Sequence, residues 1–156
     1  MIREKLIDPI LNLLKQGVTP EKLSWSFAVG ILLGTFPILG ITTALCVLAT
    51  FLFKLNPVAI QVANYLAYPL QFILLIPFMR LGETIFGVDH VALQIPELLE
   101  FFKRDWTGFL KTYGMTGLRG VFAWALLAPW VTMILRHSFL ILFRRISARR
   151  PGSPGV

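Results

Sequence analysis

Charged side chains are missing from this sequence where a water-soluble domain would need them. Between Leu23 and Met79 only Lys54 carries a charge. A soluble chain of this size needs polar residues every few positions to face water, which excludes a small soluble domain. Hydrophobic residues make up 56% of the chain and charged residues 15%, whereas soluble domains average about 45–50% and about 25%. The sequence therefore predicts a protein whose solvent is lipid.

Reactive residues are also scarce. Cys46 is the only cysteine, so no internal disulfide can form. The apolar blocks hold no acid, and no residues stand at metal-ligand spacing or in a Ser–His–acid arrangement. Asp89 and His90 are neighbours in a predicted loop, which is too little for a site. The sequence predicts no enzymatic activity, no metal site and no cofactor.

The net charge of +7 does not indicate nucleic-acid binding, because the basic residues flank apolar segments. The predicted partners are the lipid bilayer and anionic lipid headgroups, which basic residues beside membrane segments attract. The first 23 residues carry seven charges and no adequate apolar run, so we expect no secretory signal peptide.

Two uncharged blocks dominate the chain. The first, over 27–53, would measure about 40 Å as one helix, more than the hydrocarbon layer of about 30 Å. Pro37 interrupts it, and this predicts either two half-helices around a break or one strongly kinked span. The second block, over 58–79, is expected to break at Pro69 and again at Pro77.

We therefore predict an all-α, small polytopic membrane protein whose helices are broken by proline and glycine, with one amphipathic helix at the interface. The expected segments are an amphipathic N-terminal helix over 1–18, a membrane-embedded core of two broken apolar segments over 19–82, an amphipathic interfacial region over 83–117, a C-terminal transmembrane segment over 118–143 and a basic disordered tail over 144–156.

The basic tail favours a cytoplasmic C-terminus, because lysine and arginine beside a membrane segment mark the cytoplasmic face. Its arginines are Arg144, Arg145, Arg149 and Arg150. If both broken blocks cross the membrane, the N-terminus lies outside. If one block re-enters, both termini lie inside. The sequence leaves both arrangements open.

Several short motifs occur in order between residues 28 and 82. They are the run Gly30-Ile31-Leu32-Leu33-Gly34-Thr35-Phe36-Pro37-Ile38-Leu39-Gly40, then Lys54-Leu55-Asn56-Pro57-Val58-Ala59, Tyr68-Pro69-Leu70-Gln71 and Arg80-Leu81-Gly82. In this order the region resembles the uncharacterised bacterial membrane family called domain of unknown function 2062. The chain departs from the usual family residues at Thr42, Thr43, Tyr68 and Gln71. The resemblance implies a multi-pass protein of the bacterial inner membrane and brings no activity with it.

A polar pocket is predicted where the two breaks meet. Unwound backbone inside a bilayer survives only when it is buried in protein or faces a wet cavity. The candidate pocket residues are Thr35, Pro37, Gly40, Thr42, Thr43, Asn64, Tyr68, Pro69 and Gln71. Half-helix ends at such a pocket would present partial charges to an ion, a phosphate or a lipid headgroup. The alternative is that these residues only satisfy the kinked backbone.

Three further residues are expected at the membrane interface: Lys54, Asn56 and Arg80. Asn56 precedes Pro57 and is typical of a helix cap, while Lys54 is typical of a snorkelling anchor or a headgroup contact. Gly30 and Gly34 form a G-x-x-x-G pattern, which indicates close helix packing within one chain or between two.

Two functions fit these observations. The first is an oligomeric transport or translocation unit for a small polar solute, an ion or a lipid, because so few spans rarely enclose a pathway alone. The second is a non-catalytic membrane scaffold or partner subunit, in which the breaks only shape a docking surface.

Overall fold

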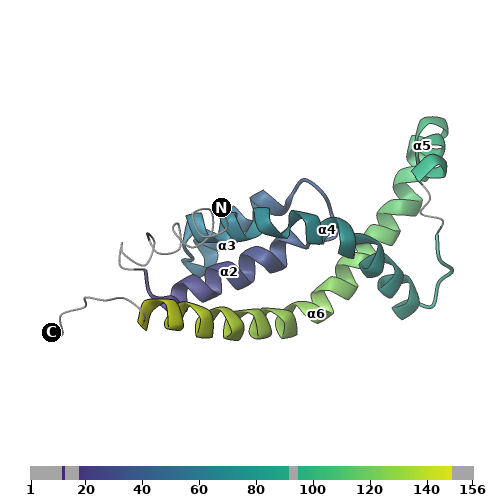
Figure 1. The fold of residues 1–156 in the computed structure, drawn as a ribbon. Coiled ribbons are helices and arrows are strands. Elements are labelled where there is room, and N and C mark those ends of the chain that lie inside the picture. The colour runs from purple at the N-terminus through teal and green to yellow at the C-terminus, as the bar shows by residue number, and fades with distance from the viewer. Residues whose placement is uncertain (1–11, 13–17, 92–94, 149–156) are drawn as a thin grey trace.

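The computed structural model describes residue 12 and residues 18–91 and 95–148. These residues form helices and their connections, with no β-strand in the described part of the chain (Figure 1). The all-α class predicted from the sequence is confirmed. Most of the predicted helix over 1–18, and residues 149–156 of the predicted tail, lie outside the described residues.

The first apolar block forms two separate helices. Helix α2 (Pro20–Gly34) begins at Thr19, whose hydroxyl accepts a hydrogen bond from a backbone N–H in the first turn. Helix α3 (Thr42–Phe53) follows after a connection over 35–41, in which Pro37 lies. The block therefore contains two separate helices, with Pro37 in the connection between them.

The residues that follow α3 lie beside the first half of α2. The Asn56 backbone N–H donates to Ser26 Oγ at 2.9 Å, and the Ser26 hydroxyl donates to the Lys22 carbonyl at 2.8 Å. Ser26 is fully buried in α2, while Asn56 follows the end of α3. Helices α2 and α3 therefore form an antiparallel hairpin whose two open ends lie together.

Helix α4 (Pro57–Ile85) runs as one continuous helix of 29 residues (Figure 1). Asn56 caps its start, because Asn56 Oδ1 accepts from the Ala59 backbone N–H at 2.9 Å. The helix continues through Pro69 and Pro77, so the interruptions predicted there are not found. Each proline removes one backbone donor, and both are exposed, so neither ring is forced into the packed face of the helix.

The last two helices divide the region predicted as one amphipathic segment over 83–117. Helix α5 (Ile95–Arg104) ends just before Asp105, and helix α6 (Trp106–Ala148) begins just after it. Asp105 Oδ1 accepts from the Gly108 N–H and the Thr107 hydroxyl, each at 2.9 Å, and the Gly108 bond holds the Asp105 pKa below its usual range. This cap starts α6 a dozen residues before the predicted segment over 118–143, and α6 includes the first residues of the predicted tail.

Helix α5 packs on the first turns of α6 through aromatic rings. The Phe102 ring centroid lies 5.0 Å from that of Trp106 and 5.2 Å from that of Phe109. Figure 1 shows α5 and the beginning of α6 projecting away from the other helices. Helix α6 then passes α4 and returns along α2, where Phe143 packs against Phe27 with ring centroids 5.3 Å apart.

The backbones of α2 and α4 approach each other at two glycines. A Cβ atom on Gly30 would lie 2.5 Å from the Ile60 carbonyl oxygen, and one on Gly34 would lie 2.6 Å from the Ala67 Cβ. Farther along α4, a Cβ atom on Gly82 would collide with the Arg119 backbone of α6. The G-x-x-x-G pattern of α2 is therefore used within one chain.

We predict that Gly30→Ala destabilises the protein by about 1–3 kcal/mol, since the added methyl group must push two helix backbones apart. The matched control is Gly114→Ala in α6, where a Cβ atom meets nothing within 4 Å. This control is expected to keep or raise stability, because alanine favours helix over glycine. Thermal unfolding of the two purified variants, followed by circular dichroism, checks the prediction, and equal unfolding temperatures would contradict it.

Candidate functional site

Four polar side chains meet between α3 and α4, and we call them the polar seam: Thr43, Gln61, Asn64 and Tyr68. Asn64 Nδ2 lies 3.5 Å from Thr43 Oγ1 and 3.4 Å from Gln61 Oε1. The Tyr68 hydroxyl lies 3.4 Å from Thr43 Oγ1, and Gln61 Nε2 lies 3.4 Å from the Thr43 carbonyl. Good hydrogen bonds to oxygen are about 2.7–3.0 Å long, so the four groups hold one another weakly.

Asn64 is the centre of the polar seam and has one atom without a partner. Its side chain is fully buried, and its Oδ1 has no hydrogen-bond partner among the described residues. Leaving such an oxygen unbonded costs about 1–3 kcal/mol, so buried polar groups are normally satisfied by protein, water or a ligand. The seam therefore has capacity for one more donor than the described part of the chain supplies.

A second polar contact closes the turn of the hairpin. Gln71 on α4 is buried, and its Nε2 donates to the Phe36 carbonyl at 2.8 Å and lies 3.5 Å from the Ile38 carbonyl. Thr35 Oγ1 donates to the Leu32 carbonyl at 2.8 Å. Gln71 of the continuous helix α4 thus donates a hydrogen bond to a backbone carbonyl in the connection that contains Pro37.

The structure brings together some of the predicted pocket residues and separates others. Thr43, Asn64 and Tyr68 meet in the polar seam, and Gln71 holds the turn that contains Pro37. The remaining predicted residues lie apart: Thr35 ends α2, Thr42 is buried at the start of α3, Gly40 is exposed in the turn with φ +89°, and Pro69 is exposed on α4. Gln61 was not among the predicted site residues, although it stands one helical turn before Asn64.

The three predicted interfacial residues lie at helix ends or close to them. Lys54 is exposed and ends α3 in a left-handed backbone conformation with φ 51°. Asn56 caps α4 at the same end of the molecule. Arg80 lies in the last two turns of α4, where its Nη1 pairs with Glu83 Oε2 at 3.1 Å.

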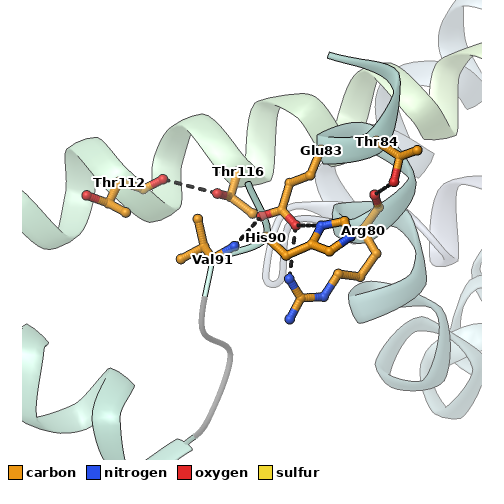
Figure 2. Close-up of polar contacts among 7 residues, drawn as sticks. All are labelled: Arg80, Glu83, Thr84, His90, Val91, Thr112 and Thr116. Atoms are coloured by element: carbon orange, nitrogen blue, oxygen red, sulfur yellow. Dashed lines mark hydrogen bonds and ion pairs between the residues drawn. The ribbon is translucent and has the colours of Figure 1, made fainter. Parts of the chain in front are cut away.

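Glu83 is the buried carboxylate at the centre of a polar cluster that was not predicted from the sequence. Figure 2 shows that Arg80 of α4, and His90 and Val91 of the segment that follows it, contact the Glu83 carboxylate. Besides Arg80, His90 Nδ1 lies 2.9 Å from Oε2, and the Val91 backbone N–H donates to Oε1 at 3.1 Å. The Glu83 side chain is fully buried, and its neighbour Gly82 lies against the Arg119 backbone of α6. The cluster holds the connection after α4 against the crossing of α4 and α6.

The spacing of residues in the sequence does not predict which carboxylate His90 contacts. His90 adjoins Asp89 in the sequence, yet its ring meets Glu83, seven residues back. The available signal was the i, i+3 pair of Arg80 and Glu83 at the end of an uncharged block. Among the described residues no group of three His, Cys, Asp or Glu side chains could hold a metal ion.

A family model covers nearly the whole chain. It is described as "Uncharacterized protein conserved in bacteria (DUF2062)" and matches residues 5–151. The chain therefore belongs to this family, and the resemblance seen in its motifs is confirmed. No curated protein and no solved structure matches the chain. The family description gives no activity.

We predict that Glu83→Ala releases the connection after α4, because the Val91 N–H loses its acceptor and Arg80 its partner. A hydrogen bond to a charged group contributes about 1.5–3 kcal/mol. Limited proteolysis of the purified protein should then cleave between residues 86 and 91 at least several-fold faster than in the parent. Glu97→Ala removes an exposed carboxylate on α5 and serves as control; equal cleavage of both variants would refute the anchoring role.

Proposed function

We propose that the chain is an integral protein of the bacterial inner membrane in which α4 and α6 cross the bilayer and the α2–α3 hairpin re-enters. Two described helices, α4 and α6, are long and apolar enough to span a membrane. With 15 and 12 residues, α2 and α3 measure about 22 and about 18 Å, less than the hydrocarbon layer of about 30 Å. The hairpin returns to the side from which it starts, so neither helix needs to cross.

Exposed apolar side chains support a lipid environment. Phe51 is 77% exposed, Ile73 68% and Trp130 72%, and they lie on three different helices. Large exposed apolar surfaces of this kind typically mark contact with a membrane or with another protein. In a bilayer the same side chains face hydrocarbon.

The distribution of positive charge supports one orientation. Lys22 at the start of α2, Lys54 at the end of α3 and Arg144 and Arg145 at the end of α6 belong to helix ends that meet at one end of the molecule. We call this end the basic end. Lysine and arginine concentrate on the cytoplasmic side of membrane proteins. Both the start of α2 and the end of α6 are therefore assigned to the cytoplasm, the second of the two arrangements left open by the sequence.

Within this arrangement the protein acts as a transport or translocation unit for a small polar solute, an ion or a lipid. The observation that carries this proposal is the polar seam, with its long hydrogen bonds and the unpartnered Asn64 Oδ1 inside an apolar helix pair. Polar groups buried at membrane depth are costly and typically line binding sites or pathways. Two crossing helices and one hairpin are too few to enclose a pathway, so the working unit is a homo-oligomer.

The second candidate is a membrane scaffold or partner subunit without transport. It is favoured by the contact of Gln71 with the Phe36 carbonyl, which shows that a buried polar residue can serve the hairpin turn alone. In that case the polar seam only locks α3 against α4, and water never enters it. Water access to the seam separates the two functions.

The topology is tested by single cysteines in a Cys46→Ala background. Cysteines at Lys22, Lys54 and Arg145 should react with an impermeant thiol reagent from the cytoplasmic side. A cysteine at Asp89, in the connection after α4, should react from the opposite side. The check is labelling of intact cells against inverted membrane vesicles. Labelling of positions 22 and 54 from opposite sides would show that the hairpin crosses and would overturn the proposed arrangement.

The transport function predicts that the polar seam is wet for part of the time. In the same background, cysteines at Thr43 and Asn64 should react with a small water-soluble thiol reagent at least tenfold faster than Cys46 does in the parent protein. Cys46 is a suitable internal control because it is fully buried on the same hairpin, among apolar groups such as Ala49 and Ile60. Reaction of positions 43 and 64 as slow as that of Cys46 would favour the scaffold.

A further inference from the structure

An apolar groove of about 720 Å³ lies between α2 and α3, with Thr132 of α6 at its side. Most of its wall consists of aliphatic side chains, namely Val29, Leu32, Leu33, Leu45, Leu48, Ala49, Leu52 and Leu55. Thr132 offers no free donor, because its hydroxyl donates to the Ala128 carbonyl at 2.7 Å. Ligand sites typically measure about 300–1,000 Å³, so the groove is of suitable size, and its wall suits hydrocarbon.

Positive charge is confined to one end of this groove. Lys22 and Lys54 line it there, and both are exposed. They lie at the same end because the hairpin returns to its start. Glu21, the neighbour of Lys22, is engaged by Arg144, whose Nη2 and Nε lie 2.8 and 3.2 Å from Glu21 Oε1. No aspartate or glutamate is found among the described residues that line the groove, so the charge at its end is not neutralised from within.

Two further features belong to the charged end. The Arg136 guanidinium of α6 lies 4.8 Å from the centroid of the Trp25 ring, and Trp25 lines the groove one turn beyond Lys22. Lys54 has φ 51°, a left-handed backbone that residues other than glycine rarely adopt. This conformation ends α3, since helices commonly close with a left-handed residue, and it fixes the position of Lys54 at the mouth of the groove.

We infer that the groove binds an anionic phospholipid, with one acyl chain between α2 and α3 and the lipid phosphate between the ammonium groups of Lys22 and Lys54. This inference rests on the proposed membrane arrangement, which puts the basic end at the headgroup level, and it names the class of molecule that the protein binds. Charge complementarity at one end and apolar walls along the rest match the two parts of such a lipid.

Other occupants match only one part of the groove. A free phosphate ion would meet two exposed, hydrated lysines and leave the apolar wall uncovered. A zwitterionic lipid would fill the wall, but its own positive group would lie against the two lysines. An anionic phospholipid satisfies both parts at once.

The test uses the tryptophan of the groove as the reporter. The full-length protein is placed in phosphatidylcholine nanodiscs that contain a minor fraction of phosphatidylglycerol, with brominated acyl chains on either the anionic or the zwitterionic lipid. Bromine quenches indole fluorescence at contact. Subtracting the signal of Trp25→Phe isolates Trp25 from the other three tryptophans. We expect brominated phosphatidylglycerol to quench Trp25 several-fold more than its molar fraction accounts for.

Matched variants separate the charge at the groove from general charge effects. Lys22→Gln with Lys54→Gln should abolish the excess quenching. Lys103→Gln with Arg104→Gln removes the same charge at exposed positions of α5 and should leave the quenching unchanged. Leu48→Phe should reduce it with both lysines present, because the larger side chain occupies the groove.

Three results would overturn the inference. They are equal quenching by the two brominated lipids, unchanged quenching in the double lysine variant, and displacement of the lipid by millimolar inorganic phosphate, which would indicate a simple anion site. Each leaves the cysteine-labelling result for the membrane arrangement unaffected. Labelling of positions 22 and 54 from opposite membrane faces would instead contradict the proposed membrane arrangement.

Discussion

The close approach of the α2 and α4 backbones is the contact on which the rest of the structure depends. Gly30 and Gly34 allow α2 to lie against Ile60, Ala63 and Ala67 with almost no side chain between them. In a bilayer, lipid tails are as apolar as leucine, so helices associate through packing and hydrogen bonds more than through the hydrophobic effect. Two glycines one turn apart provide such packing for a helix too short to cross by itself.

This contact gives the two faces of α3 different environments. Because α2 is fixed on α4, the returning α3 presents Thr43 to the polar residues of α4 and Leu45 and Leu48 to the groove beside α2. The Asn56–Ser26 hydrogen bond fixes the end of the hairpin, and the Gln71–Phe36 hydrogen bond fixes its turn. The hairpin is therefore tied to the long helices at both ends, and the loosely bonded polar seam lies between these two ties.

The sequence predicted the elements better than the contacts between them. Pro37, between Gly34 and Gly40, lies in the connection between α2 and α3. Pro69 and Pro77 looked equivalent in the sequence but lie inside a continuous helix. An interior proline removes one backbone hydrogen bond, and whether the helix then breaks or continues depends on the groups packed around it. The polar types of Asn64 and Tyr68 pointed to the seam. Glu83 and the groove were missed because their members are brought together by chain reversal.

The positions of charge along α4 are consistent with the membrane arrangement. From the cap at Asn56 to Arg80 the helix rises about 36 Å, close to a tilted crossing of a hydrocarbon layer about 30 Å thick. One end of this length lies beside Lys54 and the other carries Arg80 and Glu83, and no charge lies between them. The buried carboxylate of Glu83 would then lie near the second interface, where three donors compensate its charge and tie the emerging chain to the α4–α6 crossing. Charged residues thus lie at both ends of this stretch, Lys54 at the end of α3 and the Arg80–Glu83 pair on α4, and the α4 residues of the polar seam lie in the uncharged stretch between them.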